Sequence, residues 1–113
     1  MPINHAALLK IQADYETLQY ATQLRLRESQ EKEMCMLCLG SALLRLKHDF
    51  KLTWEQIAEK IEGIGDKSHA YRLARREKAL SQRAYNLAIS SINRLLENEG
   101  YEIIDFPSYP NNS

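Results

Sequence analysis

The sequence predicts an all-α domain of about five helices, and three observations lead to this class. Apolar residues recur every three or four positions over most of the chain, which is the period of an amphipathic helix. Residues that cap helices, such as Thr53 and Ser81, stand where several of these patterns begin. Glycines stand where two of the patterns end. With 113 residues, we expect one domain with one core over residues 1–113.

The first predicted helix covers residues 4–28, with Asn4 as its candidate cap. Three-and-four spacing relates Leu8, Ile11, Tyr15, Leu18 and Thr22. Two roles are open for this helix: it pairs two copies of the chain, or it folds back as one more core helix. A heptad-like pattern of this length does not establish a coiled coil.

The second predicted helix follows a polar stretch, residues 28–33, which is either a loop or an exposed turn of a continuous helix. From Met34 the chain is apolar nearly all round, as expected of a central core helix. Gly40 within it suggests a close helix contact. Cys35 and Cys38 have the spacing of a thiolate pair, but zinc requires four ligands and the three histidines show no paired spacing. We therefore expect free thiols and no metal site.

Two short helices follow, joined by a turn with two glycines. Thr53 and Gln56 have the spacing of a capping box, and the helix that they begin should end near Glu62. Gly63 and Gly65 can then adopt left-handed conformations, with Ile64 between them as a buried plug. Asp66 or Ser68 caps the next helix, whose outward residues are predicted to be His69, Arg72, Arg75, Arg76 and Lys78.

The last predicted helix begins after Ser81, carries an apolar face, and ends at Gly100. It completes a predicted core over residues 34–98. Residues 101–104 could form a short strand, for which a symmetry mate would be a plausible partner. From Pro107 onward no apolar periodicity remains, so the extended tail of residues 101–113 should be mobile at its end.

Charge is distributed unevenly in a chain whose formal net charge is zero. Residues 67–83, here named the basic segment, contain six Lys or Arg and one acid, Glu77. Residues 97–105 contain four acids and no base. A protein of this kind presents one face to a polyanion and turns the other away.

The two short helices and the helix before them resemble the λ-repressor-like (Cro/Xre-type) helix-turn-helix family. The stretch LLRLKHDFKLTWEQIAEKI is similar to its first two helices, and SHAYRLARRE is similar to its recognition helix. Ala58 matches the family's central alanine, and Ala70 and Leu73 match two buried recognition-helix positions. The resemblance covers about residues 42–96. The turn is two residues longer than usual, and Trp54 stands where the family commonly has a polar residue.

The resemblance implies a sequence-specific regulator that binds double-stranded DNA as a homodimer, most simply a small repressor. Half-sites one helical turn apart, about 34–36 Å, would follow. Ser68, His69 and Arg72 are placed for base contacts. The other members of the predicted DNA-binding set suit phosphates or lie near the edge of the face: Thr53, Lys67, Tyr71, Arg75, Arg76, Lys78 and Arg83. The alternative is a protein-interaction module, such as an inhibitor, adaptor or antitoxin.

Other functions find little support in the sequence. No Ser/His/Asp order, carboxylate pair or phosphate-cradling glycine loop stands out, so we predict neither an enzyme nor a cofactor. The N-terminal residues lack a basic leader followed by an apolar block, and no apolar run reaches the roughly 20 residues of a membrane helix. Two cysteines do not make a disulfide framework. A cytoplasmic protein without a membrane segment is expected.

Overall fold

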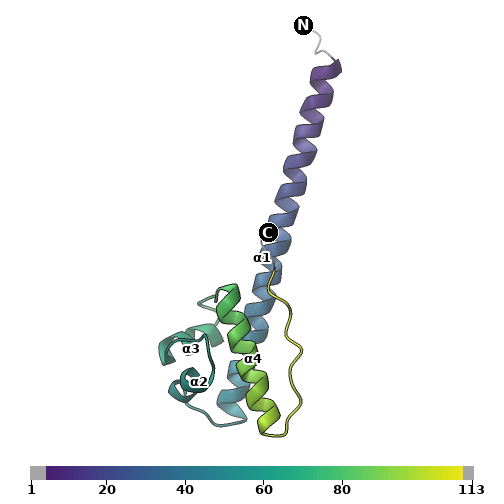
Figure 1. Cartoon of the computed structure of the whole chain (residues 1–113). Coiled ribbons are helices and arrows are strands. Elements are labelled where there is room, and N and C mark those ends of the chain that lie inside the picture. The colour runs from purple at the N-terminus through teal and green to yellow at the C-terminus, as the bar shows by residue number, and fades with distance from the viewer. Residues whose placement is uncertain (1–4, 111–113) are drawn as a thin grey trace. The chain divides into compact units, whose positions relative to one another are not determined.

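The computed structural model describes residues 5–110, and the side chains of residues 5–12 and 15 lie outside that description. The described residues form four α-helices and no strand: α1 (His5–His48), α2 (Trp54–Lys60), α3 (Lys67–Ala74) and α4 (Gln82–Asn98) (Figure 1). The all-α class is confirmed. The predicted cap Asn4 and the predicted stripe residues Leu8, Ile11 and Tyr15 cannot be compared, because they fall outside the described set.

The helix count differs from prediction because the first two predicted helices are one. Residues 28–33, the polar stretch ESQEKE, continue α1 without a break. The stretch has no apolar residue, but Glu, Gln and Lys are good helix formers and it contains neither Gly nor Pro. Of the two interpretations left open by the sequence, the continuous helix is the one found; Ser29, Gln30 and Glu33 are exposed, and the other three residues are half-buried.

The chain divides into two compact units, residues 1–30 and 31–113. In the first, no described side chain from residue 13 onward is buried, and its large apolar residues Leu18, Tyr20, Leu24 and Leu26 are exposed. The second unit holds the hydrophobic core. This core takes residues from all four helices, among them Leu39, Leu43, Ile57, Leu73 and Ile92.

Within the second unit, α4 runs alongside the C-terminal part of α1, and α2 and α3 lie on one side of these two helices (Figure 1). Gly40 makes the approach of α3 possible, because a Cβ at this position would lie 3.0 Å from the Leu73 carbonyl oxygen and 3.3 Å from that of Ala74. The predicted close contact at Gly40 is therefore confirmed. Ile64 is buried, as expected of the plug between two glycines.

The helix ends follow the predicted capping residues in most places. Thr53 and Gln56 form the expected capping box, although α2 ends at Lys60, slightly before Glu62. Asp66, not Ser68, caps α3: its carboxylate accepts a hydrogen bond from the His69 N–H at 2.9 Å. Ser81 caps α4 by accepting from the Ala84 N–H.

The C-terminal tail differs from both expectations made for it. Residues 101–104 form no strand, and the Asn93 side chain bonds both backbone groups of Ile104. Its amide donates to the Ile104 carbonyl at 2.9 Å and accepts from the Ile104 N–H at 2.8 Å. Pro107 to Pro110, expected to be mobile, are packed: the Tyr85 hydroxyl donates to the Pro107 carbonyl, and the Tyr109 hydroxyl donates to that of Leu80 at 3.2 Å. Residues 111–113 lie outside the description.

Candidate nucleic-acid interface

The α2–α3 pair is joined by a turn whose backbone requires glycine at two places. Gly63 has a φ of 86° and Gly65 a φ of 102°, both in the left-handed region. A Cβ at Gly63 would also overlap the Ala84 carbonyl oxygen, so this residue lets the turn lie against the start of α4. The turn is thus part of a contact with α4.

Ser91 of α4 holds the same turn by two hydrogen bonds. Its Oγ accepts from the Glu62 N–H at 3.2 Å and donates to the Lys60 carbonyl at 3.0 Å. These groups at the end of α2 would otherwise have no intrahelical partner. Ser91 is buried and was not predicted from the sequence as a functional or structural residue. The sequence feature that could have identified it is a hydroxyl residue on the apolar face of a helix. Together with Gly63, Ser91 holds the turn against α4 and so sets the position at which α3 begins.

The outward face of α3 carries Ser68, Tyr71 and Arg72. Ala70, Leu73 and Ala74 form the opposite, buried face. Ser68 and Arg72 are exposed and lie one turn apart. Within the described part of the chain, the Arg72 guanidinium makes no hydrogen bond or ion pair. It is therefore available to a ligand.

His69 does not share this face. Its ring is half-buried and turns back toward the start of the helix, where Nδ1 lies 3.9 Å from the Asp66 carboxylate and close to Gly65. The hydrogen bond from the His69 N–H, followed by the charges of His69 and Lys78, holds the pKa of the Asp66 carboxyl below its ordinary value. The predicted base contact from His69 is not supported by this position.

The basic segment continues beyond α3 in a bend rather than along the helix. α3 ends at Ala74, so Arg76 and Lys78, predicted on the helix, lie after it. The Glu77 N–H bonds the Arg72 carbonyl at 2.8 Å, and the Arg76 N–H bonds that of Leu73 at 3.1 Å, which is a Schellman motif. Arg76 occupies the left-handed position of this motif with a φ of 60°. A non-glycine residue there costs about 1–2 kcal/mol.

Arg75 and Tyr71 are tied into a surface cluster with Trp54. The Arg75 guanidinium donates to the Tyr71 hydroxyl at 2.8 Å and to the Glu77 carboxylate at 3.1 Å, and these bonds raise the pKa of Arg75 above its ordinary value. The Tyr71 ring meets the edge of Trp54 at 5.7 Å between centroids. Lys47 lies over the Trp54 ring at 5.4 Å. Trp54 thus braces α2 against α3, and Lys47 adds a positive charge that sequence reasoning missed.

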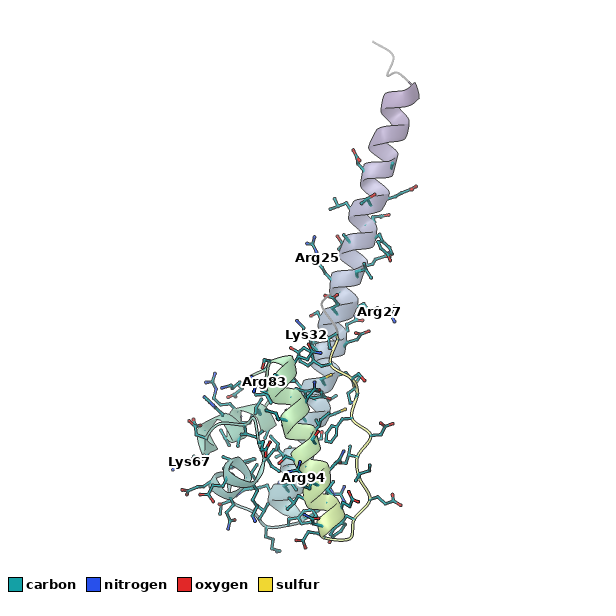
Figure 2. The ribbon with its side chains drawn as sticks, in the orientation of Figure 1. Arg25, Arg27, Lys32, Lys67, Arg83 and Arg94 are labelled. Atoms are coloured by element: carbon teal, nitrogen blue, oxygen red, sulfur yellow. The ribbon has the colours of Figure 1, made fainter. Side chains whose placement is uncertain are left out.

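The remaining predicted basic residues frame α3. Figure 2 shows Lys67 at the start of α3 and Arg83 in the first turn of α4. Both are exposed, as is Arg76, whereas Lys78 is half-buried. Arg83 also lines a surface hollow of about 470 Å³ along α4. Thr53 is exposed, but its hydroxyl accepts the Gln56 N–H and its own N–H donates to the Gln56 side chain. A phosphate contact at this position would therefore use backbone N–H groups at the start of α2 and not the Thr53 side chain.

No metal or redox centre is apparent in residues whose side chains are described. No group of three or more His, Cys, Asp or Glu side chains is arranged to hold a metal ion there. Cys35 and Cys38 are free thiols. Cys35 is buried beneath the tail, 3.5 Å from the Ser108 carbonyl, and burial raises the pKa of its thiol and of the neighbouring Tyr85 hydroxyl. Both groups stay neutral near pH 7.

Comparison with models of protein families, with curated proteins and with solved structures found no match. The likeness to the λ-repressor-like family therefore remains a prediction made from the residues. None of the helices in the described part of the chain combines the length and apolar content needed to cross a membrane.

Proposed function

We propose that the protein binds double-stranded DNA, with the outward face of α3 in the major groove. The observation that supports this most is Arg72: it is exposed on the face opposite the core, and its guanidinium has no intramolecular partner among the described residues. A free guanidinium in this position can bond the O6 and N7 atoms of a guanine bidentately. Ser68, one turn earlier, reaches the same groove.

The Lys and Arg side chains around Arg72 then supply affinity for DNA of any sequence. Lys67 begins α3, Arg76 follows its C-terminal end and Arg83 lies in the first turn of α4, and all three are exposed, so each can contact a phosphate. Arg75 is held beside Tyr71 and Glu77 in an exposed pair, which a phosphate can replace at small cost. The helix α2 carries the exposed acids Glu55 and Glu59 against one base, Lys60, whereas α3 carries Lys67 and Arg72 and no acid, so positive charge is more concentrated on α3.

Two described non-glycine residues have a left-handed backbone, Lys51 and Arg76, and the second of them lies in the basic segment and supports the proposal. Residues held in strained backbone conformations cluster at functional sites. Arg76 keeps a guanidinium directly after the recognition-helix candidate at a position where glycine would be relaxed. A phosphate contact from Arg76 would explain that choice. We further propose that the chain acts as a homodimeric repressor in the cytoplasm, occluding a promoter with a roughly two-fold operator.

The test is a binding titration on duplexes selected from a random pool, repeated at several salt concentrations. We expect the logarithm of the binding constant to fall linearly with the logarithm of salt, with a slope of about −0.9 for each phosphate contacted. A slope near zero, or no binding at low salt, would overturn the proposal.

A protein-interaction module is the second candidate, and the exposed apolar residues of the first unit favour it. Leu18, Tyr20, Leu24 and Leu26 lie on the surface of a single helix. A scaffold of this type could instead cover an acidic protein with its basic segment. Absence of duplex binding, combined with a stable complex with an acidic protein partner, would favour this candidate over DNA binding.

A further inference from the structure

One stripe of α1 in the first unit has an order of residues that is complementary to itself. Asp14, Leu18, Ala21 and Arg25 are spaced by four, three and four positions, so they lie along one side of the helix over about three turns. Leu18 is 62% exposed, Asp14 and Arg25 are exposed, and Ala21 is half-buried. Along the helix, the stripe therefore consists of an acidic residue, a large apolar residue, a small apolar residue and a basic residue, in that order.

A two-fold axis between Leu18 and Ala21 matches this order with that of a second copy. Asp14 of one helix then faces Arg25 of the other, and Leu18 faces Ala21, each pairing occurring twice. Opposite charges meet at both ends, and a large side chain meets a small one in the middle, which is the alternation that lets facing helices interdigitate. A two-fold contact requires this self-complementarity of one surface patch.

A parallel arrangement of the same stripes lacks this match. It would place Asp14 against Asp14 and Arg25 against Arg25, and like charges at such positions repel. Ala21 would face Ala21 and leave a gap beside the Leu18 pair. The charge pattern therefore selects between the two directions, and it also favours a second copy of the chain over an unrelated partner.

We propose that residues 14–25 of α1 form an antiparallel contact with the same residues of a second copy. This inference deepens the homodimer part of the proposed function and rests on it, but it does not depend on DNA binding. The occupant of this stripe is thus another molecule of this chain, in the opposite direction.

Charge reversal in the full-length chain tests the direction. Asp14→Arg alone, or Arg25→Asp alone, places like charges together twice in an antiparallel pair, so each should weaken self-association by at least about fivefold. The double variant D14R/R25D restores both ion pairs and should recover the original dissociation constant. Sedimentation equilibrium without DNA measures all three. Glu33→Arg, an exposed reversal outside the stripe, should leave association unchanged.

The apolar centre has its own matched control. Leu18 and Tyr20 are exposed to similar extents, 62% and 65%, but they are about 200° apart around the helix. Leu18→Ser should weaken association, whereas Tyr20→Ser should not. Circular dichroism on each variant checks that α1 remains helical.

Three outcomes would overturn the inference. Single reversals without effect would indicate a parallel pair, a stronger effect of Tyr20→Ser than of Leu18→Ser would place the contact on the other face, and a chain that stays monomeric would exclude the pairing. None of these bears on the salt-dependent DNA titration, so DNA binding by a monomer would leave the proposed interface of α3 standing while removing this contact.

Discussion

Arg76 occupies at the end of α3 the same left-handed backbone position that Gly100 occupies at the end of α4. Their φ angles are 60° and 81°. In both places the N–H of the next residue bonds a carbonyl five residues back, from Glu77 to Arg72 and from Tyr101 to Leu96. Glycine takes this conformation without steric cost and arginine does not. The two helix ends thus share one motif but differ in the residue at its strained position.

Arg76→Gly should therefore stabilise the fold and weaken DNA binding together. Relief of the left-handed conformation, reduced by the greater freedom of glycine in the unfolded chain, leaves a gain of about 0.5–1 kcal/mol. Loss of the guanidinium removes one phosphate contact and lowers the salt slope by about 0.9. Urea unfolding and the salt titration measure the two effects. A variant that gains stability and binds equally well would exclude Arg76 from the interface.

Gly63→Ala should destabilise the protein more than Gly100→Ala. Both residues have positive φ, so each substitution brings a backbone cost of about 1 kcal/mol. Nothing lies within 4 Å of a Cβ at Gly100, whereas one at Gly63 would overlap the Ala84 carbonyl oxygen. We expect a total of about 2–4 kcal/mol at Gly63, because the turn must leave α4. Equal losses in urea unfolding would mean that this turn does not depend on close contact with α4.

Ser91→Ala should cost about 1–3 kcal/mol of unfolding free energy. The substitution leaves the Glu62 N–H and the Lys60 carbonyl without the partner that Ser91 provides. Ser90→Ala is the matched control, because Ser90 is exposed on the same helix and should change the unfolding free energy by no more than about 0.5 kcal/mol. If both variants unfold at the same urea concentration, the Ser91 hydroxyl does not hold the turn.

Asp66 should make the stability of α3 depend on pH in the acid range. Its folded pKa lies below the ordinary value of 3.8, chiefly because the carboxylate accepts the His69 N–H. A lowered folded pKa means that the stabilising contribution is present above the unfolded pKa. It is lost as pH falls from about 5 through the folded value. Asp66→Asn keeps a capping side chain and should flatten this part of the unfolding profile; an unchanged slope would show that other carboxyls cause it.

Local signals in the sequence predicted most helix boundaries. The capping box at Thr53, the cap at Ser81 and the stop at Gly100 each depend on residues within one turn of the helix end. Such features are readable because the interacting groups are close in the chain. The same is true of the glycine turn with Ile64 as its plug.

Features that depend on distant residues were not predictable in this way. The tail is packed because Tyr85 and Tyr109 bond carbonyls 22 and 29 residues away, which no local pattern reveals. The early end of α3 carries no Gly or Pro signal, since Arg76 takes the place that glycine usually has. The role of Ser91 depends on the turn lying against α4.

The most direct measurement of the central claim compares Arg72→Ala with Arg94→Ala on a selected duplex. Both are exposed arginines, but Arg94 is on α4, outside the basic segment (Figure 2). Fluorescence anisotropy should show that Arg72→Ala loses about 1–3 kcal/mol of preference for the selected site over a scrambled duplex, while Arg94→Ala retains it. Retention of full preference by Arg72→Ala, or an equal loss in both variants, would contradict the assignment of α3 as the DNA-reading helix.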